Sequence, residues 1–210
     1  VHKQYLIIQD RPVLYYSLKE FEDSAVDEIV LVVGKGEEEF CRREIVDKYG
    51  ISKVKAIVEG GKERYHSVFE GLKQTSDADY VLIHDGARPF VNQDIIRRCM
   101  QEVQKYQACV VGMPVKDTIK IADEEGYAKQ TPDRKNVWMI QTPQTFSYAL
   151  IYEAYEEMLK TEDTAITDDA MVLERIKGKK SKLIEGSYRN IKITTPEDLL
   201  IANVYLQHPE

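Results

Sequence analysis

The chain has 210 residues, enough for one domain with a substantial core. Its 29 basic and 36 acidic residues give a net charge of −7, which argues against a general nucleic-acid-binding surface. No apolar run approaches the roughly 18 residues of a membrane span, and we expect no signal peptide. The three cysteines lack CxxC or metal-binding spacing, so we expect reduced, packed thiols in a cytoplasmic protein.

Short β-branched runs alternate with helical patterns in the first half of the chain. Helical spacing of apolar side chains follows Pro12, recurs over 65–72, and returns after Asn92, a residue that fits an N-cap. This repetition implies an α/β fold with a mainly parallel sheet flanked by helices. The expected strands are 5–8, 28–33, 54–58, 80–84 and 108–113.

The pattern changes after Pro114. Residues 116–122 alternate in polarity, 123–126 give a turn signal, and polar sequence continues to Asn136. We interpret 116–136 as a hairpin-like arm that protrudes from the body. Helices are then expected from Ser147, from Thr167 and from Thr195, the last two residues serving as N-caps.

The most informative loop is the segment HDGARP at 84–89, which ends an expected buried strand. In open α/β sheets, ligands bind at the carboxyl ends of the strands. Asp85 and Arg88 could there hold a metal ion and a phosphate together. A surface loop whose Asp–Arg pair caps a turn fits the same residues, and spacing alone favours it because such loops are common.

Further candidates are dispersed along the chain. Paired glycines at 60–61 precede the helix of Ser67 and allow close approach of a ligand, although an ordinary turn has the same composition. Lys192 alternates with two isoleucines, which predicts the polar face of a short strand at 190–194 and also fits a solvated lysine. No P-loop, HExxH or Ser–His–Asp order is present. Cations at Lys3, Arg88, Arg134 and Lys192, with one acid at Asp85, fit electrostatic catalysis on phosphates.

Read together, these segments resemble the 2-C-methyl-D-erythritol 4-phosphate cytidylyltransferase family. The motifs, in chain order, are KQYL, RPVLYYSL, GGKERYHSVFEGL, HDGARPFV, PVKDTIK, QTPQTF, TDDA and NIKITTPEDL. The resemblance implies a single Rossmann-like nucleotidyltransferase domain over 1–210, with 116–136 as a dimer arm. Ribitol-5-phosphate cytidylyltransferases share most segments, but HDGARP with TDDA is more similar to the erythritol-phosphate group.

The resemblance also implies a reaction and its residues. A cytidylyl group passes from CTP to the sugar-alcohol phosphate, pyrophosphate leaves, and Mg²⁺ is required. Catalysis would fall to Lys3, Arg134 and Lys192. The metal would contact Asp85. Nucleotide binding would involve Gly61, Ser67, Asp85, Gly86 and Arg88, and substrate binding Thr118, Thr142 and Thr167. Thr118 would reach a partner's site from the arm, so a homodimer is implied.

Two further expectations concern completeness and alternatives. The family begins with a strand and a glycine-rich loop around the triphosphate, and this sequence matches the family from Lys3 onward. We expect little activity without that loop, because its backbone N–H groups cradle phosphates. The alternatives are a cytidylyltransferase acting on ribitol 5-phosphate and an inactive nucleotide-binding homologue.

Overall fold

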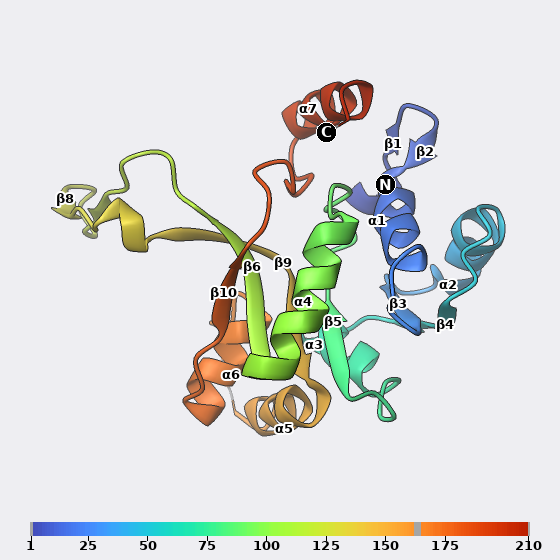
Figure 1. The fold of residues 1–210 in the computed structure, drawn as a ribbon, viewed down its shortest axis with the longest axis horizontal. Coiled ribbons are helices and arrows are strands. Elements are labelled where there is room, and N and C mark those ends of the chain that lie inside the picture. Colours follow the sequence, from blue (N-terminus) through green and yellow to red (C-terminus); the bar gives the residue numbers. More distant parts are fainter. Residues whose placement is uncertain (1, 162–164, 210) are drawn as a thin grey trace.

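The computed structural model describes residues 2–161 and 165–209. Helices and strands alternate along most of the chain (Figure 1). The helices are α1 (Val13–Glu22), α2 (Glu38–Cys41), α3 (Arg64–Leu72), α4 (Gln93–Tyr106), α5 (Tyr148–Met158), α6 (Asp169–Lys177) and α7 (Pro196–Gln207), with the short turns η1 (Lys3–Tyr5), η2 (Arg42–Asp47) and η3 (Arg134–Asn136). The strands are β1 (Ile7–Ile8), β2 (Arg11–Pro12), β3 (Ile29–Val33), β4 (Val54–Glu59), β5 (Tyr80–Ile83), β6 (Ala108–Pro114), β7 (Ile121–Ala122), β8 (Ala128–Gln130), β9 (Trp138–Ser147) and β10 (Lys182–Glu185).

The central sheet has the strand order β10-β6-β9-β5, and β3 pairs separately with β4. The pairs β10–β6 and β3–β4 are parallel, as expected for an α/β fold. β9 runs antiparallel to both β6 and β5, so the central sheet is mixed. The expectation of a mainly parallel sheet missed β9 because that strand returns from the protruding arm rather than from a helical crossover.

β9 is longer than its apolar residues suggest. Its middle carries the polar residues Gln141, Thr142 and Gln144, all buried, together with Pro143. Val110 pairs with Gln144, whereas Gly112 pairs with Ile140, so residues 141–143 face only one residue of β6. This bulge accommodates a proline that a regular central strand would exclude.

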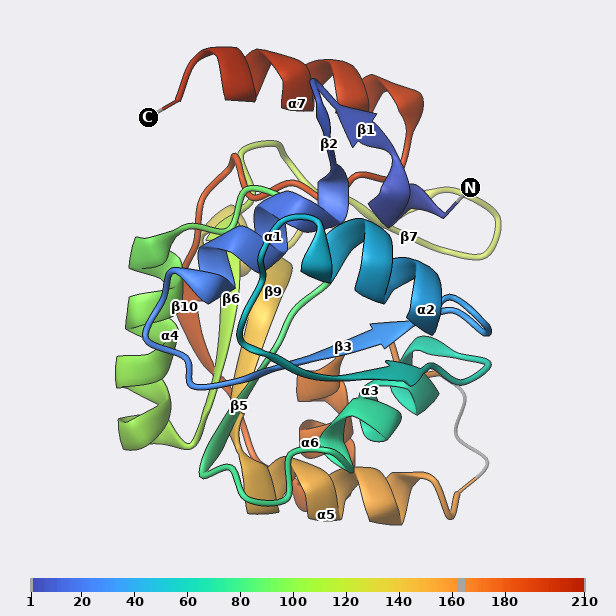
Figure 2. The same ribbon diagram turned by 90° about the vertical axis from the view of Figure 1, so that its right-hand side faces the viewer.

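The two faces of the central sheet are covered by different helices (Figures 1 and 2). Ala108 and Val110 of β6 pack in a cluster with buried side chains of α5 and α6. Cys109 and Val111, on the opposite face, pack with side chains of α4. This alternation is the period of two that a strand buried on both faces requires.

The segment 116–136 projects from the body as the expected arm (Figure 1). β7 and β8 pair antiparallel within it, and Tyr127 near its tip is 70% exposed. A role of this arm in dimerisation stays a prediction.

Two expected strands differ from the structure. Residues 5–8 divide between η1 and the two-residue β1, because β1 turns back at once to pair with β2. Residues 190–194 form no strand; Ile193 is buried, and its N–H donates to the carbonyl of Ala87. This extended segment is therefore held by the loop after β5 rather than by a sheet, and Lys192 is still directed away from the buried isoleucine.

A cavity of about 890 Å³ lies between β3 and β5, and both strands line it. Within the described residues, β3 pairs only with β4 and β5 only with β9, so each has one unpaired edge. Arg64, Asp85 and Lys192 line the same cavity. The carboxyl end of β5 thus opens into this cavity beside the sheet.

Candidate active site

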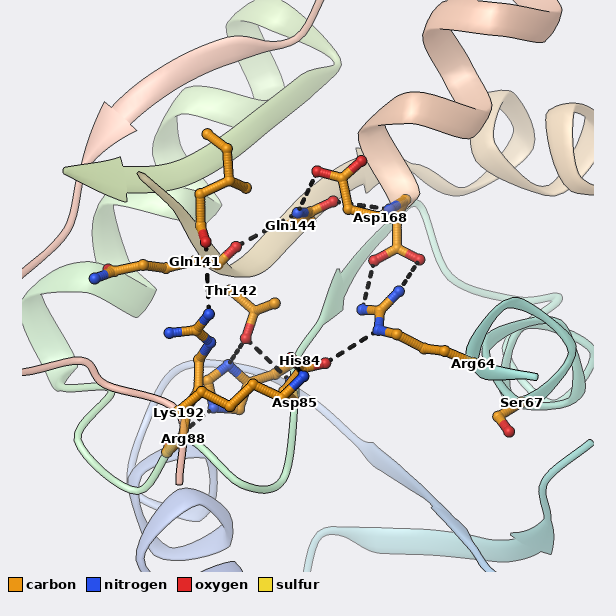
Figure 3. A network of polar contacts seen from close by, with 12 residues as sticks. Arg64, Ser67, His84, Asp85, Arg88, Gln141, Thr142, Gln144, Asp168 and Lys192 are labelled. Atoms are coloured by element: carbon orange, nitrogen blue, oxygen red, sulfur yellow. Dashed lines mark hydrogen bonds and ion pairs between the residues drawn. The ribbon is translucent and has the colours of Figure 1, made fainter. Parts of the chain in front are cut away.

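The carboxylate of Asp85, just after β5, lies between two cationic side chains (Figure 3). Arg64 Nε donates to Asp85 Oδ1 over 3.2 Å, and Lys192 Nζ donates to Asp85 Oδ2 over 2.8 Å. Desolvation would raise the pKa of Asp85, but Arg64 and Lys192 outweigh it and hold this pKa well below its usual range. Asp85 is therefore an anion at neutral pH.

The backbone of Asp85 is fixed by Thr142 in the bulge of β9. Thr142 Oγ1 accepts from the Asp85 N–H over 3.0 Å and lies 2.9 Å from His84 Nδ1. His84 Nε2 lies 3.1 Å from the carbonyl oxygen of Arg88, which only accepts. Desolvation lowers the pKa of His84 to about 4, so the ring is neutral and carries its proton on Nε2. Thr142 consequently donates its hydroxyl proton to Nδ1, and the loop at 84–88 is held in one conformation.

Arg64, the first residue of α3, is held by a buried acid. Its Nη1 and Nη2 donate to Oδ1 and Oδ2 of Asp169 over 3.0 and 2.9 Å, and Asp169 is completely buried. Tyr155 Oη also donates to Asp169 Oδ1, over 2.6 Å. Desolvation would lower the pKa of Arg64, but Asp169 and Asp85 raise it above its ordinary value. The guanidinium therefore stays charged and bridges α6 to Asp85.

Arg88 donates to backbone carbonyls rather than standing free in the cavity. Its Nη1 donates to the carbonyl of Asn190 over 2.7 Å, and Nη2 lies 3.5 Å from the carbonyl oxygen of Ile140. Asn190 in turn donates to the Thr142 carbonyl over 2.9 Å. Arg88 thus ties the HDGARP loop to β9 and to the segment before Lys192. Direct contact of Arg88 with a nucleotide stays a prediction.

Gly61 and Ser67 lie together beside a second cavity of about 530 Å³. The Gly61 N–H donates to Ser67 Oγ over 3.1 Å. A Cβ on Gly60 would lie 2.6 Å from Ser67 Oγ, and one on Gly61 would lie 2.3 Å from the Cβ of His66. Only glycine fits this turn. Ser67 lines both cavities, so the cavity beside the glycine turn and the cavity beside Asp85 border each other at this residue.

Among the described residues, four expected site residues make no hydrogen bond or ion pair with Asp85. Lys3 is exposed in η1, and Thr118 is exposed at the base of the arm. Arg134, also on the arm, donates to the carbonyl of Lys116 over 2.8 Å. Thr167 is exposed, with its hydroxyl 3.6 Å from Met171 Sδ.

The N-cap of α6 is Asp168, and the expectation of Thr167 at that position is wrong. Asp168 Oδ1 accepts from the Met171 N–H over 2.9 Å. Asn92 does cap α4, since its Oδ1 accepts from the Ile95 N–H over 2.9 Å. The helix after Thr195 begins as expected, with Asp198 Oδ2 accepting from the Thr195 N–H over 2.8 Å.

Sequence reasoning missed the residues that support the site. They are Arg64, Gln144, Asp169 and Asn190. Arg64 stands within the glycine-rich motif and Asp169 within TDDA, so each motif contained the signal, but they lie 105 residues apart. Gln144 is buried, and its Oε1 accepts from the N–H groups of Asp169 and Ala170, both over 3.0 Å.

The residues near Asp85 fit a metal ion that is bound mainly by substrate phosphates and water, with one carboxylate from the protein. Among the described residues, no three His, Cys, Asp or Glu side chains cluster in a way that could hold a metal. Mg²⁺ commonly takes one or two carboxylates together with substrate phosphates and water. Asp85 could supply one such carboxylate if a cation released one of its oxygens. The lysine is better suited to do so, because its side chain is 42% exposed whereas that of Arg64 is bound on both sides.

No helix in the described part of the chain is long and apolar enough to cross a membrane.

Comparison with known proteins identifies close relatives. The family model for 2-C-methyl-D-erythritol 4-phosphate cytidylyltransferase matches residues 1–208. A protein of that name from Lachnospira eligens is 52% identical, over 99% of this chain and 92% of its own length. Another from Lachnoclostridium phytofermentans is 48% identical, over 99% of this chain and 89% of its own length.

Solved structures agree with the sequence comparison. The crystal structure of 4-diphosphocytidyl-2C-methyl-D-erythritol synthase from Anaerococcus prevotii superposes with a TM-score of 0.90 at 37% identity, covering 99% of this chain and 91% of that one. The Thermus thermophilus 2-C-methyl-D-erythritol 4-phosphate cytidylyltransferase gives a TM-score of 0.82 at 32% identity, covering 98% and 94%. These matches confirm the α/β nucleotidyltransferase fold. The chain belongs to the 2-C-methyl-D-erythritol 4-phosphate cytidylyltransferase family.

Proposed function

We infer that the chain transfers the cytidylyl group of CTP to 2-C-methyl-D-erythritol 4-phosphate in isoprenoid precursor synthesis, with release of pyrophosphate. The observation that carries this inference is family membership over residues 1–208, and it is supported by a site in which Asp85, Lys192 and Ser67 line one cavity. The acceptor's own phosphate attacks the α-phosphorus, so the protein has to position charges rather than supply a nucleophile.

We propose the following division of the site. The turn at Gly61 and Ser67 binds the cytosine and ribose, because its backbone allows close approach and a hydroxyl faces it. Asp85, Gly86 and Arg88 form the loop beside the triphosphate. Lys192 binds the acceptor's phosphate with its exposed ammonium group. Thr142 and Thr167 line the acceptor side.

Mg²⁺ is proposed as the cofactor, with Asp85 as the protein's carboxylate ligand. When bound, the ion neutralises part of the triphosphate charge during the transfer. Chelation with EDTA should abolish turnover, and added MgCl₂ should restore it. Full turnover in EDTA would contradict a metal requirement.

A homodimer is proposed because Thr118 and Arg134 lie on the arm. The arm carries exposed apolar side chains, including Ile121 and Tyr127, which a second copy could cover. Arg134 would then position the acceptor phosphate in the partner's site. Light scattering should give twice the monomer mass of 24.2 kDa, and a monomer with full activity would contradict the shared site.

We further propose that a glycine-rich loop completes the triphosphate site next to Lys3, which would stabilise charge on the α-phosphate. The unpaired edges of β3 and β5 that line one cavity support the presence of a further strand between them. Protein carrying such a segment ahead of Lys3 should turn over faster than residues 1–210 alone.

The decisive experiment measures pyrophosphate release from CTP with two acceptors in parallel. We expect release with 2-C-methyl-D-erythritol 4-phosphate and Mg²⁺, and little with ribitol 5-phosphate. Preference for ribitol 5-phosphate would favour that alternative. Absence of turnover with either acceptor, with the glycine-rich segment present, would favour an inactive nucleotide-binding homologue.

Lys192→Ala tests the assignment of the acceptor phosphate. We expect turnover to fall on the order of 100-fold, because a positioning contact is lost. Stability should change by less than about 1 kcal/mol, since the side chain is 42% exposed. Lys19→Ala is the matched control, with a similarly exposed lysine paired to Asp23, and should leave turnover unchanged. Parallel losses of turnover and stability in Lys192→Ala would contradict the role.

A cytoplasmic location is proposed from the cysteines. Cys41, Cys99 and Cys109 are buried free thiols, which suits a compartment that keeps thiols reduced.

A further inference from the structure

The two cations on Asp85 are held very differently. Arg64 has all three of its nitrogens engaged, one on Asp85 and two on the buried Asp169. Lys192 Nζ has Asp85 Oδ2 as its hydrogen-bond partner among the described residues, and its side chain is 42% exposed. One cation is therefore fixed and the other is free to move.

The fixed cation is secured by α5 and β9. Tyr155 donates to Asp169 Oδ1 over 2.6 Å, and the Asp169 N–H donates to Gln144 Oε1 over 3.0 Å. Moving Arg64 would leave Asp169 as a buried charge without its partner, which is strongly destabilising. Moving Lys192 costs only a partly exposed ion pair, and such pairs contribute little to stability.

We propose that Arg64 is a positioning residue that holds Asp85 Oδ1 and balances its charge, so that Lys192 can leave Oδ2 for the phosphate of the acceptor. The Lys192–Asp85 contact is then the resting state of the site. Arg64 and Asp169 stay in place as substrate binds. This inference rests on the proposed function for the identity of the acceptor. The different hold of Arg64 and Lys192 on Asp85, however, is a property of the protein itself.

Removal of Arg64 should hold Lys192 more tightly on Asp85. With Arg64 gone, Lys192 becomes the main counter-charge of Asp85, and its release to a phosphate becomes more costly. The expected signature is a KM for 2-C-methyl-D-erythritol 4-phosphate raised at least tenfold, with a smaller change in the KM for CTP. A purely structural role for Arg64 would lower the amount of folded enzyme without this selectivity.

Arg64 is replaced both in the single variant Arg64→Gln and in a double variant, because Arg64→Gln alone leaves the buried Asp169 carboxylate without its charge partner. The double variant Arg64→Gln/Asp169→Asn replaces the buried ion pair with two neutral amides. Asp169→Asn alone is the matched control, since it keeps the guanidinium charge next to Asp85. Met158→Ala creates a cavity in the buried cluster that also contains Tyr155 and makes no contact with Asp85. It controls for the effects of lost stability.

A second readout does not depend on turnover. Acylation of Lys192 by a small amine-reactive ester, followed by peptide mass spectrometry, reports how freely Nζ moves. We expect labelling at least threefold slower in the double variant than in the wild type. Asp169→Asn and Met158→Ala should label within twofold of the wild type, and Asp85→Asn should label faster.

A folded double variant with wild-type labelling of Lys192 and a wild-type KM for the acceptor would overturn the proposal. Failure of both Arg64 variants to fold would assign Arg64 to the fold alone and would overturn it as well. If the wild type does not turn over either acceptor, the proposed function fails, whereas the labelling comparison still decides the relation between Arg64 and Lys192.

Discussion

Gln144 supports the start of α6, and replacing it should damage both stability and the site. Its Oε1 accepts from the N–H groups of Asp169 and Ala170, two donors of the first helical turn, each over 3.0 Å. Its Nε2 donates to Asp168 Oδ2 over 3.1 Å. Gln144 is only 1% exposed, so water cannot easily replace these contacts.

Gln144→Leu leaves two buried N–H groups without their acceptor. Each unsatisfied donor costs about 1–3 kcal/mol, so we expect a loss of about 3 kcal/mol after partial relaxation. Urea unfolding followed by circular dichroism measures this loss at pH 7. Gln101→Leu, an exposed glutamine on α4, is the matched control and should stay within about 0.5 kcal/mol of the wild type.

Gln144→Glu separates the role of Oε1, which accepts from α6, from the role of Nε2, which donates to Asp168. It keeps an acceptor for the helix N–H groups but places a second carboxylate against Asp168. We expect its stability deficit to grow from pH 5 to pH 8, as the introduced carboxyl group loses its proton. A loss below 0.5 kcal/mol in Gln144→Leu, or a pH-independent deficit in Gln144→Glu, would refute this account of Gln144.

Three further predictions follow from other parts of the structure. Gly61→Ala should raise the KM for CTP roughly tenfold with little change in kcat, because its Cβ would lie 2.3 Å from that of His66; an unchanged KM would count against the proposed base site. Asp198→Ala should cost about 1 kcal/mol at neutral pH by urea unfolding. Because the N–H groups of Thr194 and Thr195 lower the pKa of Asp198, its contribution is present above the unfolded pKa and should vanish as the pH falls below about 4. Burial raises the pKa of Cys99 to about 11, so its thiol should react with Ellman's reagent at pH 8 only after unfolding, and fast reaction of native protein would contradict the packing.

Local patterns predicted much of the fold. The apolar runs at β3, β4, β5 and β6 and the N-caps at Asn92 and Thr195 depend on neighbouring residues, and they lie where expected. β9 was not among the expected strands, because Pro143 and three polar residues occupy its middle. Its bulge is a shift in register against β6, a strand distant in the sequence, and no local pattern specifies that shift.

The residues of the candidate site could also be predicted only in part. Asp85 and Lys192 could be nominated from motifs, and the structure brings their charged groups to 2.8 Å. Arg64 and Asp169 could not be paired in advance, because a charge pair 105 residues apart leaves no periodic signal. Thr167 was chosen as a cap on residue type, whereas its neighbour Asp168 has the side chain that accepts from the third N–H of the helix.

The polar residues in the middle of β9 are tolerated in a central strand because their side chains bind other parts of the site. Gln141 accepts from Asn190, whose carbonyl binds Arg88; Thr142 fixes the N–H of Asp85; and Gln144 holds the start of α6. Burying these strand residues without partners would be unfavourable, and Gln141, Thr142 and Gln144 each have a hydrogen-bond partner. The partners belong to three segments that are far apart in the sequence: the loop of Asp85, the segment that leads to Lys192, and the start of α6, which is linked to Asp85 through Arg64. The stretch QTPQ interrupts the apolar pattern of the strand and makes its pairing with β6 irregular. In return, its side chains fix the positions of the segments that carry the charged groups of the site.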